Sequence, residues 1–500
     1  MQWGEMRRVR RYLTVLLGAA LGASTAFAQE DAGVLTAEQV LESIENNGDY
    51  AITAAQADMD IARAKLKEAG AGLMPSLTLS TTAQVYRPRA HKKYPDDNRE
   101  VYGKLEVVQP VYDFGQAGSV QDAAGRDAEA AEFAFTAARN TVLMEGLALY
   151  YDLHASELEM RALYEGHTSA YLKWDRAKEN QALGRDSPIG VAQTLALAEK
   201  TRLVYFRERT RNAGYRLRLE ELMGVSLPEE LISPPEPPKA KHGEVDRDAF
   251  VEVVWARNPD LLVLAKQAEA AGLRRDGVAA LPSLDAFAST GYSTRDLRGR
   301  NDYAVGARLN WPIFDGGLTQ AKKTRMAAEL SRTVARYEAR KSDLRRQAYT
   351  VLMERDDAYQ RVLSALAQHG FTSKNLLRRQ QLYAQERVSE LGRAMIDHTA
   401  AEAELVRATG AYAMIQAKIA VMLGEHPGRG LDPDFMAETV GVMDDTGTFV
   451  PKSGTGFGQD DAGEFKRQDI VPVHPDVQPG GQPPAPKPAP VEGVAPAPVN

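Results

Sequence analysis

The stretch Pro110-Val111-Tyr112-Asp113-Phe114-Gly115 occurs a second time, in related form, as Pro312-Ile313-Phe314-Asp315-Gly316-Gly317. Each copy ends an alternating apolar and polar segment and begins a long stretch without proline. An Asp just before Gly is typical of turns and helix starts. A unit that recurs along a chain predicts one body built from related halves. We therefore expect strand-to-helix turns at Pro110, Asp113 and Gly115 and again at Pro312, Asp315 and Gly317.

Four segments alternate strictly enough to predict strands, each with one apolar and one polar face. They are residues 76–86, 101–107, 284–292 and 303–311. An ordinary β-sandwich also alternates, but four strands in two distant hairpins suit a sandwich poorly. The lengths favour staves of a transmembrane β-barrel. Aromatic residues near the strand ends are then the expected interface anchors, namely Tyr86, Tyr112, Tyr292 and Trp311.

Four strands cannot close a barrel by themselves, because about eight is the smallest workable number. If these strands cross a membrane, several copies of the chain must pair their strand edges, which also removes the exposed edges.

Two helical stretches, residues 115–183 and 317–391, are too long for a globular core, at roughly 100 and 110 Å. Four shorter ones accompany them, at residues 36–69, 185–224, 246–278 and 393–424. Asn47-Gly48 and Asn258-Pro259 interrupt two of these. Two of the shorter helices placed end to end are about as long as one long helix. The lengths match when 185–224 is joined to 246–278 and when 393–424 is joined to 36–69. The predicted fold is thus mixed and mainly α, with a tall helical wall continuing the strands.

Composition sets the domain limits. Residues 1–28 have the Arg-rich start, short apolar run and Ala26-Phe27-Ala28 end of a secretory signal peptide. We then expect a first repeat at 29–224, a Pro-rich equatorial linker at 225–245, a second repeat at 246–430, and a tail at 431–500. From about residue 472 the tail is rich in Pro and predicted to be disordered.

Several functions are disfavoured. The formal charge is −7, and removing four Arg and one Glu with the signal peptide makes it −10, which argues against a nucleic-acid partner. The chain has no Cys, and its eight His include no helix pair with metal-ligand spacing. We found no phosphate loop, nucleophile elbow or acid–base pair. The sequence predicts no enzymatic activity, no cofactor and no metal.

The duplicated hairpins, the signal peptide and the two Pro-x-x-Asp-x-Gly turns resemble the TolC-like outer-membrane factor family. The resemblance spans roughly residues 33–425 and implies a homotrimer with a twelve-stranded barrel and a periplasmic helical barrel. It implies as partners outer-membrane lipid, a periplasmic adaptor and an inner-membrane pump of the RND, ABC or MFS class. The location is then the outer membrane of a Gram-negative bacterium, with a periplasmic extension. Members often have Asn-Pro early in each half, but the first half here has Asn47-Gly48.

The resemblance also assigns residues at the periplasmic end. Two Leu-Gly-Arg triplets, which we place in the helix–helix turns, become adaptor-docking tips: Leu183, Gly184, Arg185, Leu391, Gly392 and Arg393. Gly suits such reversals in any case. Asp397 resembles the aspartates that ring the closed aperture. Asp186, just past the first turn, is the second candidate for this aperture, although capping the next helix is the more ordinary role for it.

The function we expect is passive exit through a trimeric outer-membrane channel-tunnel, for efflux or type I secretion. The alternative is a periplasmic coiled-coil scaffold or adaptor without its own barrel. A self-sufficient porin would need more strands. The sequence does not identify the cargo or the pump class.

Overall fold

The computed structural model describes residues 35–85, 99–227, 235–238, 243, 245–279, 281–293, 303–385, 390–432, 435–439, 442–443 and 449–450. All of them lie in the first of two compact units, residues 1–453 and 454–500. The predicted signal peptide, Tyr86, most of the linker and the Pro-rich tail lie outside the described residues. No helix among the described residues is both long and apolar enough to cross a membrane.

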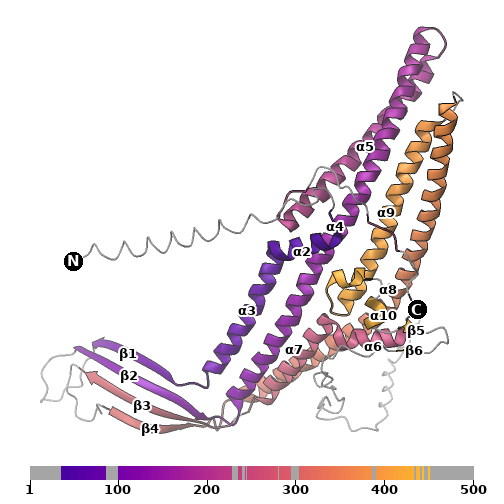
Figure 1. Cartoon of the computed structure of the whole chain (residues 1–500). Coiled ribbons are helices and arrows are strands. Elements are labelled where there is room, and N and C mark those ends of the chain that lie inside the picture. The colour runs from indigo at the N-terminus through magenta and orange to yellow at the C-terminus, as the bar shows by residue number, and fades with distance from the viewer. Residues whose placement is uncertain are drawn as a thin grey trace, which may run out of the picture. The chain divides into compact units, whose positions relative to one another are not determined.

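Helices make up most of this unit, and a four-stranded and a two-stranded sheet accompany them (Figure 1). In chain order the elements are α2 (Ala37–Asn47), α3 (Tyr50–Ala71), β1 (Ser76–Val85), β2 (Arg99–Tyr112), α4 (Gln116–Ala182), α5 (Pro188–Met223), α6 (Arg247–Arg257), α7 (Pro259–Asp276), β3 (Ser283–Ser293), β4 (Tyr303–Asn310), α8 (Leu318–Ala384), α9 (Leu391–Met422), the 3-10 helix η1 (Pro427–Leu431), α10 (Phe435–Thr439), β5 (Val442–Met443) and β6 (Phe449–Val450). The predicted mainly helical fold with four alternating strands is confirmed.

The four long strands form one antiparallel sheet in the order β1-β2-β3-β4. Besides the two expected hairpins, β2 pairs with β3, which joins the two repeats into a single sheet. Because all three pairings are in matching register, the apolar residues of all four strands share one face. Leu79 is opposite Leu105, Val107 opposite Ala288, and Ala288 opposite Val305.

Helices α4 and α8 are the two rods, each of 67 residues, or roughly 100 Å at 1.5 Å per residue. Helix α4 packs against α5 and α9 towards one end and against α3 and α7 towards the sheet, and α8 packs against α9, α7 and α6 (Figure 1). These neighbours bury the apolar stripe that an isolated helix would expose.

The core lies where the shorter helices end. One cluster joins α2, α4 and α5 through Val40, Leu41, Ile44, Leu143, Leu147, Leu219 and Leu222. The second joins α6, α8 and α9 through Phe250, Val251, Val254, Leu344, Ala348, Ile419 and Leu423. Complete burial of one such side chain contributes about 1.5–3 kcal/mol. Each repeat therefore packs its shorter helices against its long helix through an equivalent apolar cluster.

The half-length helices join differently from the predicted end-to-end pairing. The Asn47 amide donates to the carbonyls of Glu221 and Leu222, so α5 ends at the α2–α3 break. The Asn258 amide donates to the carbonyl of Met422, so α9 ends at the α6–α7 break. Each two-piece rod is therefore built within one repeat. The prediction was wrong because lengths alone do not identify which ends meet.

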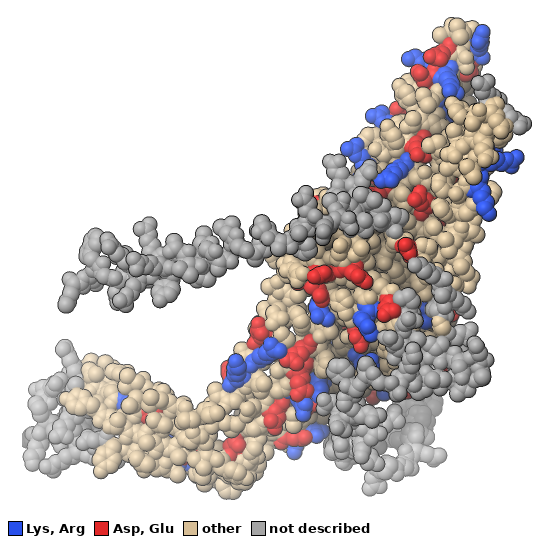
Figure 2. All heavy atoms as spheres, viewed as in Figure 1, with Lys and Arg blue, Asp and Glu red and all other residues tan. Residues whose placement is uncertain are grey.

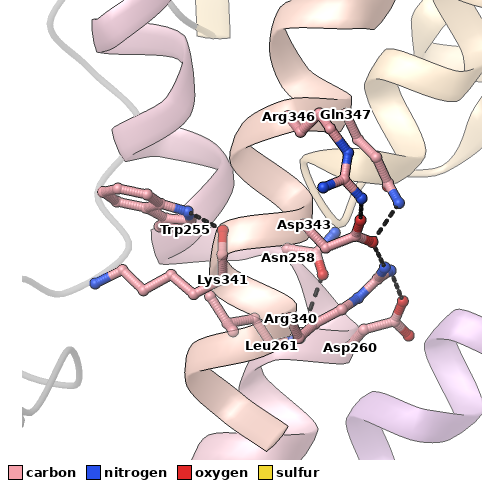
Figure 3. A network of polar contacts seen from close by, with 9 residues as sticks. All are labelled: Trp255, Asn258, Asp260, Leu261, Arg340, Lys341, Asp343, Arg346 and Gln347. Atoms are coloured by element: carbon pink, nitrogen blue, oxygen red, sulfur yellow. Dashed lines mark hydrogen bonds and ion pairs between the residues drawn. The ribbon is translucent and has the colours of Figure 1, made fainter. Parts of the chain in front are cut away.

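The second break is tied to α8 by a polar network (Figure 3). Trp255 Nε1 donates to the Lys341 carbonyl at 3.1 Å. Arg340 bonds Asp260 at 2.6 Å and Asp343 at 3.0 Å. The Trp255 and Asp260 contacts cross from α6 and α7 to α8 and hold the break against the long rod, while Asp343, within α8, orients Arg340.

Candidate functional site

The apolar face of the sheet is uncovered. Leu79, Tyr303 and Val305 expose 72%, 80% and 82% of their surface. Their neighbours on this face, Leu77, Leu105, Val107, Tyr292 and Leu309, are exposed as well. Soluble monomers seldom expose so large a contiguous apolar patch, which usually marks a protein or membrane contact. Figure 2 shows few charged side chains over the strands, whereas charges gather over the helices.

Aromatic side chains stand near both ends of the strands. Of the predicted anchors, Tyr112, Tyr292 and Trp311 are exposed, and Tyr86 is outside the described residues. A register shift between Pro110 and Tyr112 places Tyr112 opposite Leu284, on the apolar face. Tyr303, which pairs with Thr290 and is exposed, is a further aromatic residue at a strand end that the sequence analysis did not name as an anchor. Its position at the start of an alternating segment was the signal.

The opposite face of the sheet is polar and has one charged cluster. Lys104 Nζ lies 2.8 Å from Glu106 Oε2, and Arg308 Nη2 lies 3.6 Å from Glu106 Oε1. The Arg308 guanidinium also lies over the Phe287 ring, 5.1 Å from its centroid. Sequence reasoning missed this cluster, because β2 and β4 are distant in the chain.

Both strand-to-helix turns contain the predicted aspartate and glycine, but the prediction that Pro110 belongs to the turn was wrong, because β2 continues through it to Tyr112. The Asp113 carboxylate accepts from the backbone N–H groups of Gly115 and Ala117, at 3.0 and 2.6 Å. The Asp315 carboxylate accepts from Gly317 and Thr319 at 3.0 and 2.8 Å. Hydrogen bonding from the Thr319 hydroxyl and backbone lowers the pKa of Asp315. The aspartates therefore start α4 and α8.

These turns also need left-handed backbone. Gly115 and Gly317 have φ of 82° and 87°, a region that Gly adopts without cost. The preceding residue is left-handed too. It is Gly316 in one repeat but Phe114, with φ of 57°, in the other. Pro110 lies within β2, beside the bulge, whereas Pro312 lies beyond the end of β4.

The first helix–helix turn lies where the sequence placed it. Leu183 ends α4, and Gly184 is left-handed with φ of 70°. The N–H of Gly184 donates to the Gln181 carbonyl at 2.9 Å, and that of Arg185 to the Asn180 carbonyl at 2.8 Å. This is the Schellman pattern that ends many helices at a glycine.

The second turn is displaced from its prediction. Helix α8 ends at Ala384, and α9 already begins at Leu391 with Glu390 as its N-cap. Leu391, Gly392 and Arg393 are thus the first turn of a helix, and the expectation that they form the reversal was wrong. Residues 386–389, between the two helices, lie outside the described residues. The prediction rested on the same Leu-Gly-Arg triplet as the first turn. Gly184 has the left-handed conformation that a turn glycine needs, but Gly392 does not.

The two predicted aperture aspartates have different surroundings. Ser187, not Asp186, caps α5, because its hydroxyl accepts from Gly190 N–H at 3.1 Å, and Pro188 occupies the first helical position. Asp186 instead accepts from the N–H of Ser187 at 2.7 Å. Asp397 lies on an exposed face of α9, with one carboxylate oxygen 4.0 Å from Arg393 Nε. It is available to solvent.

Among the described residues, no three His, Asp or Glu side chains gather closely enough to hold a metal ion. The charged pairs that do occur are salt bridges, some within one helix or strand and others between different ones.

Residues 42–225 match the family model described as outer membrane efflux protein. That family is one of transport proteins rather than of enzymes. No curated protein matches the chain.

Solved structures similar to this chain include three outer-membrane channels. The Campylobacter jejuni CmeC channel has 15% identity and a TM-score of 0.63, with 85% of this chain and 95% of that chain covered. Vibrio cholerae VceC has 18% identity and a TM-score of 0.58, with 78% and 96% covered. The open state of Neisseria gonorrhoeae MtrE has 16% identity and a TM-score of 0.57, with 79% and 90% covered.

The resemblance to TolC-like outer-membrane factors is therefore confirmed. So is the predicted location in the outer membrane of a Gram-negative bacterium. The family match and these neighbours support an outer-membrane efflux channel.

Proposed function

From the confirmed resemblance to the outer membrane efflux proteins, we propose that three copies of this chain form a channel-tunnel. Substrates delivered by an inner-membrane transporter and a periplasmic adaptor would leave through it passively, in efflux or type I secretion. The chain itself would perform no chemistry on its cargo.

The observation that carries this proposal is the one-sided sheet. Its register gathers the apolar residues of four strands on one face, and none of the described helices covers that face. In water, this exposed surface is costly at about 25 cal/mol per Å². Against lipid the cost disappears, and the polar face then lines the interior, as in outer-membrane barrels.

The sheet edges require that several copies assemble. Strands β1 and β4 are the two outer strands, and their unpaired N–H and C=O groups cannot remain unsatisfied within lipid. Pairing β4 of one chain with β1 of the next removes both edges. Three copies give twelve strands, which is enough to close a barrel.

The helical ends are the proposed docking sites for the adaptor. Leu183, Gly184 and Arg185 form an exposed tip in which the Arg185 side chain is free to reach carbonyl or carboxylate groups. On the other hairpin, Leu391, Gly392 and Arg393 would contribute as the first turn of α9 beside the reversal. The pump would be of the RND, ABC or MFS class.

We also propose that Asp397 lines the closed periplasmic aperture, where three copies would favour cations. Asp397→Ala should weaken block by a multivalent cation added from the periplasmic side of a planar bilayer. Asp186→Ala tests, in the same assay, the exposed carboxylate beside the other turn, which we propose as the second aperture residue. Equal block in wild type and Asp397→Ala would exclude this role.

The domain division proposed from sequence accompanies this function: a signal peptide at 1–28, repeats at 29–224 and 246–430, an equatorial linker at 225–245, and a C-terminal tail at 431–500.

One experiment separates the channel from a periplasmic scaffold. We expect the protein to stay with outer membranes after carbonate washing and, once purified in detergent, to form steady conducting pores in planar bilayers. A protein that washes free and gives no conductance would overturn the channel and favour the scaffold.

A further inference from the structure

We propose that α8 of one copy packs along α3 of the next copy, and that Arg332 and Asp58 form an ion pair across this contact. The inference rests on the proposed function, because it concerns the way in which three copies close the helical wall. It goes beyond that function by identifying residues through which one copy recognises another.

Chain connectivity places these two helices at the edges of the wall. Helix α3 leads directly into β1, and α8 follows β4, and these are the two outer strands. Beside the sheet the helices lie in the order α3-α4-α7-α8, because α3 packs against α4, α4 against α7, and α7 against α8. Pairing β4 of one copy with β1 of the next therefore brings α8 of the first beside α3 of the second.

An equivalent contact already exists within the chain, between the two repeats. Strand β2 pairs with β3, and α4, which follows β2, packs against α7, which precedes β3. Arg126 Nε of α4 lies 3.2 Å from Glu269 Oε2 of α7, and Lys266 Nζ of α7 lies 2.9 Å from Glu129 Oε2 of α4. The repeats make α8 the counterpart of α4, and α3 the counterpart of α7. The contact between copies should therefore pair its helices in the same way.

One face of α3 is uncovered where α7 is not. Helix α7 lies between α4 and α8, and Ala268 in it is 3% exposed. Its counterpart in α3 is Ile61, because the two residues lie equally far before the prolines that precede β3 and β1. Ile61 is 51% exposed. It belongs to a row of exposed residues spaced three or four apart, which share one face of the helix. The row is Tyr50, Ala54, Ala57, Ile61 and Ala64.

Helix α8 has a matching row of small exposed residues, spaced in the same way. Two of them, Ala328 and Ser331, are the counterparts of Arg126 and Glu129, because they lie equally far after the turn aspartates. On α4 these positions contact α7, whereas on α8 they are exposed. Small side chains let two helix axes approach to the short end of the usual range of about 8–10 Å. The row is Ala321, Thr324, Ala328, Ser331 and Ala335.

The contact within the chain also sets the level at which the helices meet. Lys266 pairs with Glu129, and their counterparts are Met59 of α3 and Ser331 of α8. The two helices run in opposite directions, because α3 leads towards the sheet and α8 leads away from it. When Met59 and Ser331 are level, the two rows lie side by side over most of their length.

One flank of the paired rows carries opposite charges. Asp58 directly follows a row residue of α3, and Arg332 directly follows a row residue of α8, so in antiparallel helices both lie on the same side. The two residues are level in this register, and both are exposed, which brings carboxylate and guanidinium within reach. On the same flank Lys65 comes level with Arg325, whose Nε lies 3.9 Å from Glu329 Oε1. That carboxylate is then shared by two cations, which limits their repulsion.

Cysteine pairs test the contact. The chain has no Cys, and within one chain α4 and α7 separate α3 from α8 by about 24–30 Å, which no disulfide spans. Ile61 and Ala328 face each other in the register above, so oxidised Ile61→Cys/Ala328→Cys protein in outer membranes should give linked species of two and three chains. Ile61→Cys/Ala339→Cys is the matched control, because exposed Ala339 lies about 16 Å further along α8. It should remain monomeric on a denaturing gel.

Charge exchange tests the ion pair. Arg332→Asp and Asp58→Arg should each lower the ratio of trimer to monomer in detergent several-fold at low salt, because like charges then meet at three contacts. The double variant Asp58→Arg/Arg332→Asp restores opposite charges and should return that ratio towards the wild-type value. Single variants that assemble as well as wild type, or a double variant no better than either, would overturn the ion pair.

The outcome also separates this inference from the channel itself. Wild-type protein that conducts, while the two cysteine pairs give only monomers or equal linking, would overturn the α8–α3 contact and leave the channel intact. Wild-type protein that neither assembles nor conducts would overturn both.

Discussion

The two helix breaks serve the same purpose with different residues. At Asn47-Gly48 and at Asn258-Pro259, an Asn amide donates to carbonyls in the last turn of the half-length helix that ends there. Asn47 is exposed, whereas Asn258 is 4% exposed and also caps α7 by accepting from Leu261 N–H at 3.2 Å. The comparison teaches that the shared requirement is the Asn donor. Proline is an addition in the second repeat.

Each arriving helix ends in a left-handed glycine that lies against the break. Gly224 has φ of 69°, and a Cβ there would lie 2.2 Å from the Asn47 side-chain oxygen. Gly424 has φ of 75°, and a Cβ there would lie 2.7 Å from the backbone oxygen of Arg257. The second contact is with backbone, which cannot rotate away. The second break should therefore tolerate change less well than the first.

The largest expected difference is between alanine substitutions at these glycines. Gly424→Ala should lower the free energy of unfolding by about 3 kcal/mol, from left-handed strain and a backbone clash. Gly224→Ala should cost about 2 kcal/mol, since the Asn47 side chain can move but loses its hydrogen bond. Gly48→Ala, left-handed but with only an ordinary contact to Thr53 Oγ1 at 4.0 Å, should cost only about 1 kcal/mol. Urea unfolding in detergent, followed by far-UV circular dichroism, measures all three. An equal cost at the three sites would show that the clashes play no part.

A second difference concerns buried basic residues of the long rods. His154 follows buried Leu147 in α4 at the spacing at which Arg355 follows buried Ala348 in α8, and both side chains are 3% exposed. Burial lowers the pKa of His154 from 6.5 to about 4. The unfolded chain therefore takes up this proton as the pH falls through 6.5, while the folded chain does so only near pH 4.

This difference should destabilise the wild type by roughly 3 kcal/mol between pH 6.5 and pH 4. His154→Gln should remove that part of the pH dependence. Arg355 remains charged in both states and should contribute none over this range. Parallel stability–pH curves for wild type and His154→Gln would contradict the assigned burial.

The third difference concerns the two Asn donors. Asn258→Ala should cost about 2 kcal/mol, because it leaves the buried Met422 carbonyl without its Asn258 donor. Asn47→Ala, at an exposed site, should cost about 1 kcal/mol. Exposed Asn46→Ala is the control and should change little. A larger loss for Asn47 than for Asn258 would reverse the ranking drawn from burial.

The smallest effect is expected for Pro259→Ala. Proline at the first helical position only restricts the unfolded chain, so its loss should cost less than about 1 kcal/mol. A loss above 2 kcal/mol in thermal unfolding would mean that proline, rather than Asn258, defines the break.

Local pattern predicted the strands and the first tip. Alternation placed β1 and β4 within a residue or so of their observed ends, because the period of two is a property of the strand itself. Gly184 marked its turn because only a residue tolerant of positive φ fits there. Gly392 occurs in the same triplet but within a helix, so the triplet alone did not locate the second turn.

The contacts between segments distant in the chain could not be predicted from the sequence. The β2–β3 pairing, the joining of α5 to the α2–α3 break, and the meeting of Arg308 with Glu106 all connect segments distant in the chain. Each is selected by packing in three dimensions, and residue spacing does not report it.

The central claim is that the sheet is one third of a closed barrel, and disulfide cross-linking of its edges tests it most directly. The chain has no Cys, so one Cys in β1 and one in β4 define the only possible bridge. Within one chain these outer strands lie three strand spacings apart, roughly 14 Å, beyond the reach of a disulfide. Ala304→Cys combined in turn with Thr78→Cys, Ser80→Cys or Thr82→Cys samples the unknown register. We predict oxidised bands of two and three chains and none larger. Only monomers in every register, or a ladder that continues beyond three chains, would contradict the account.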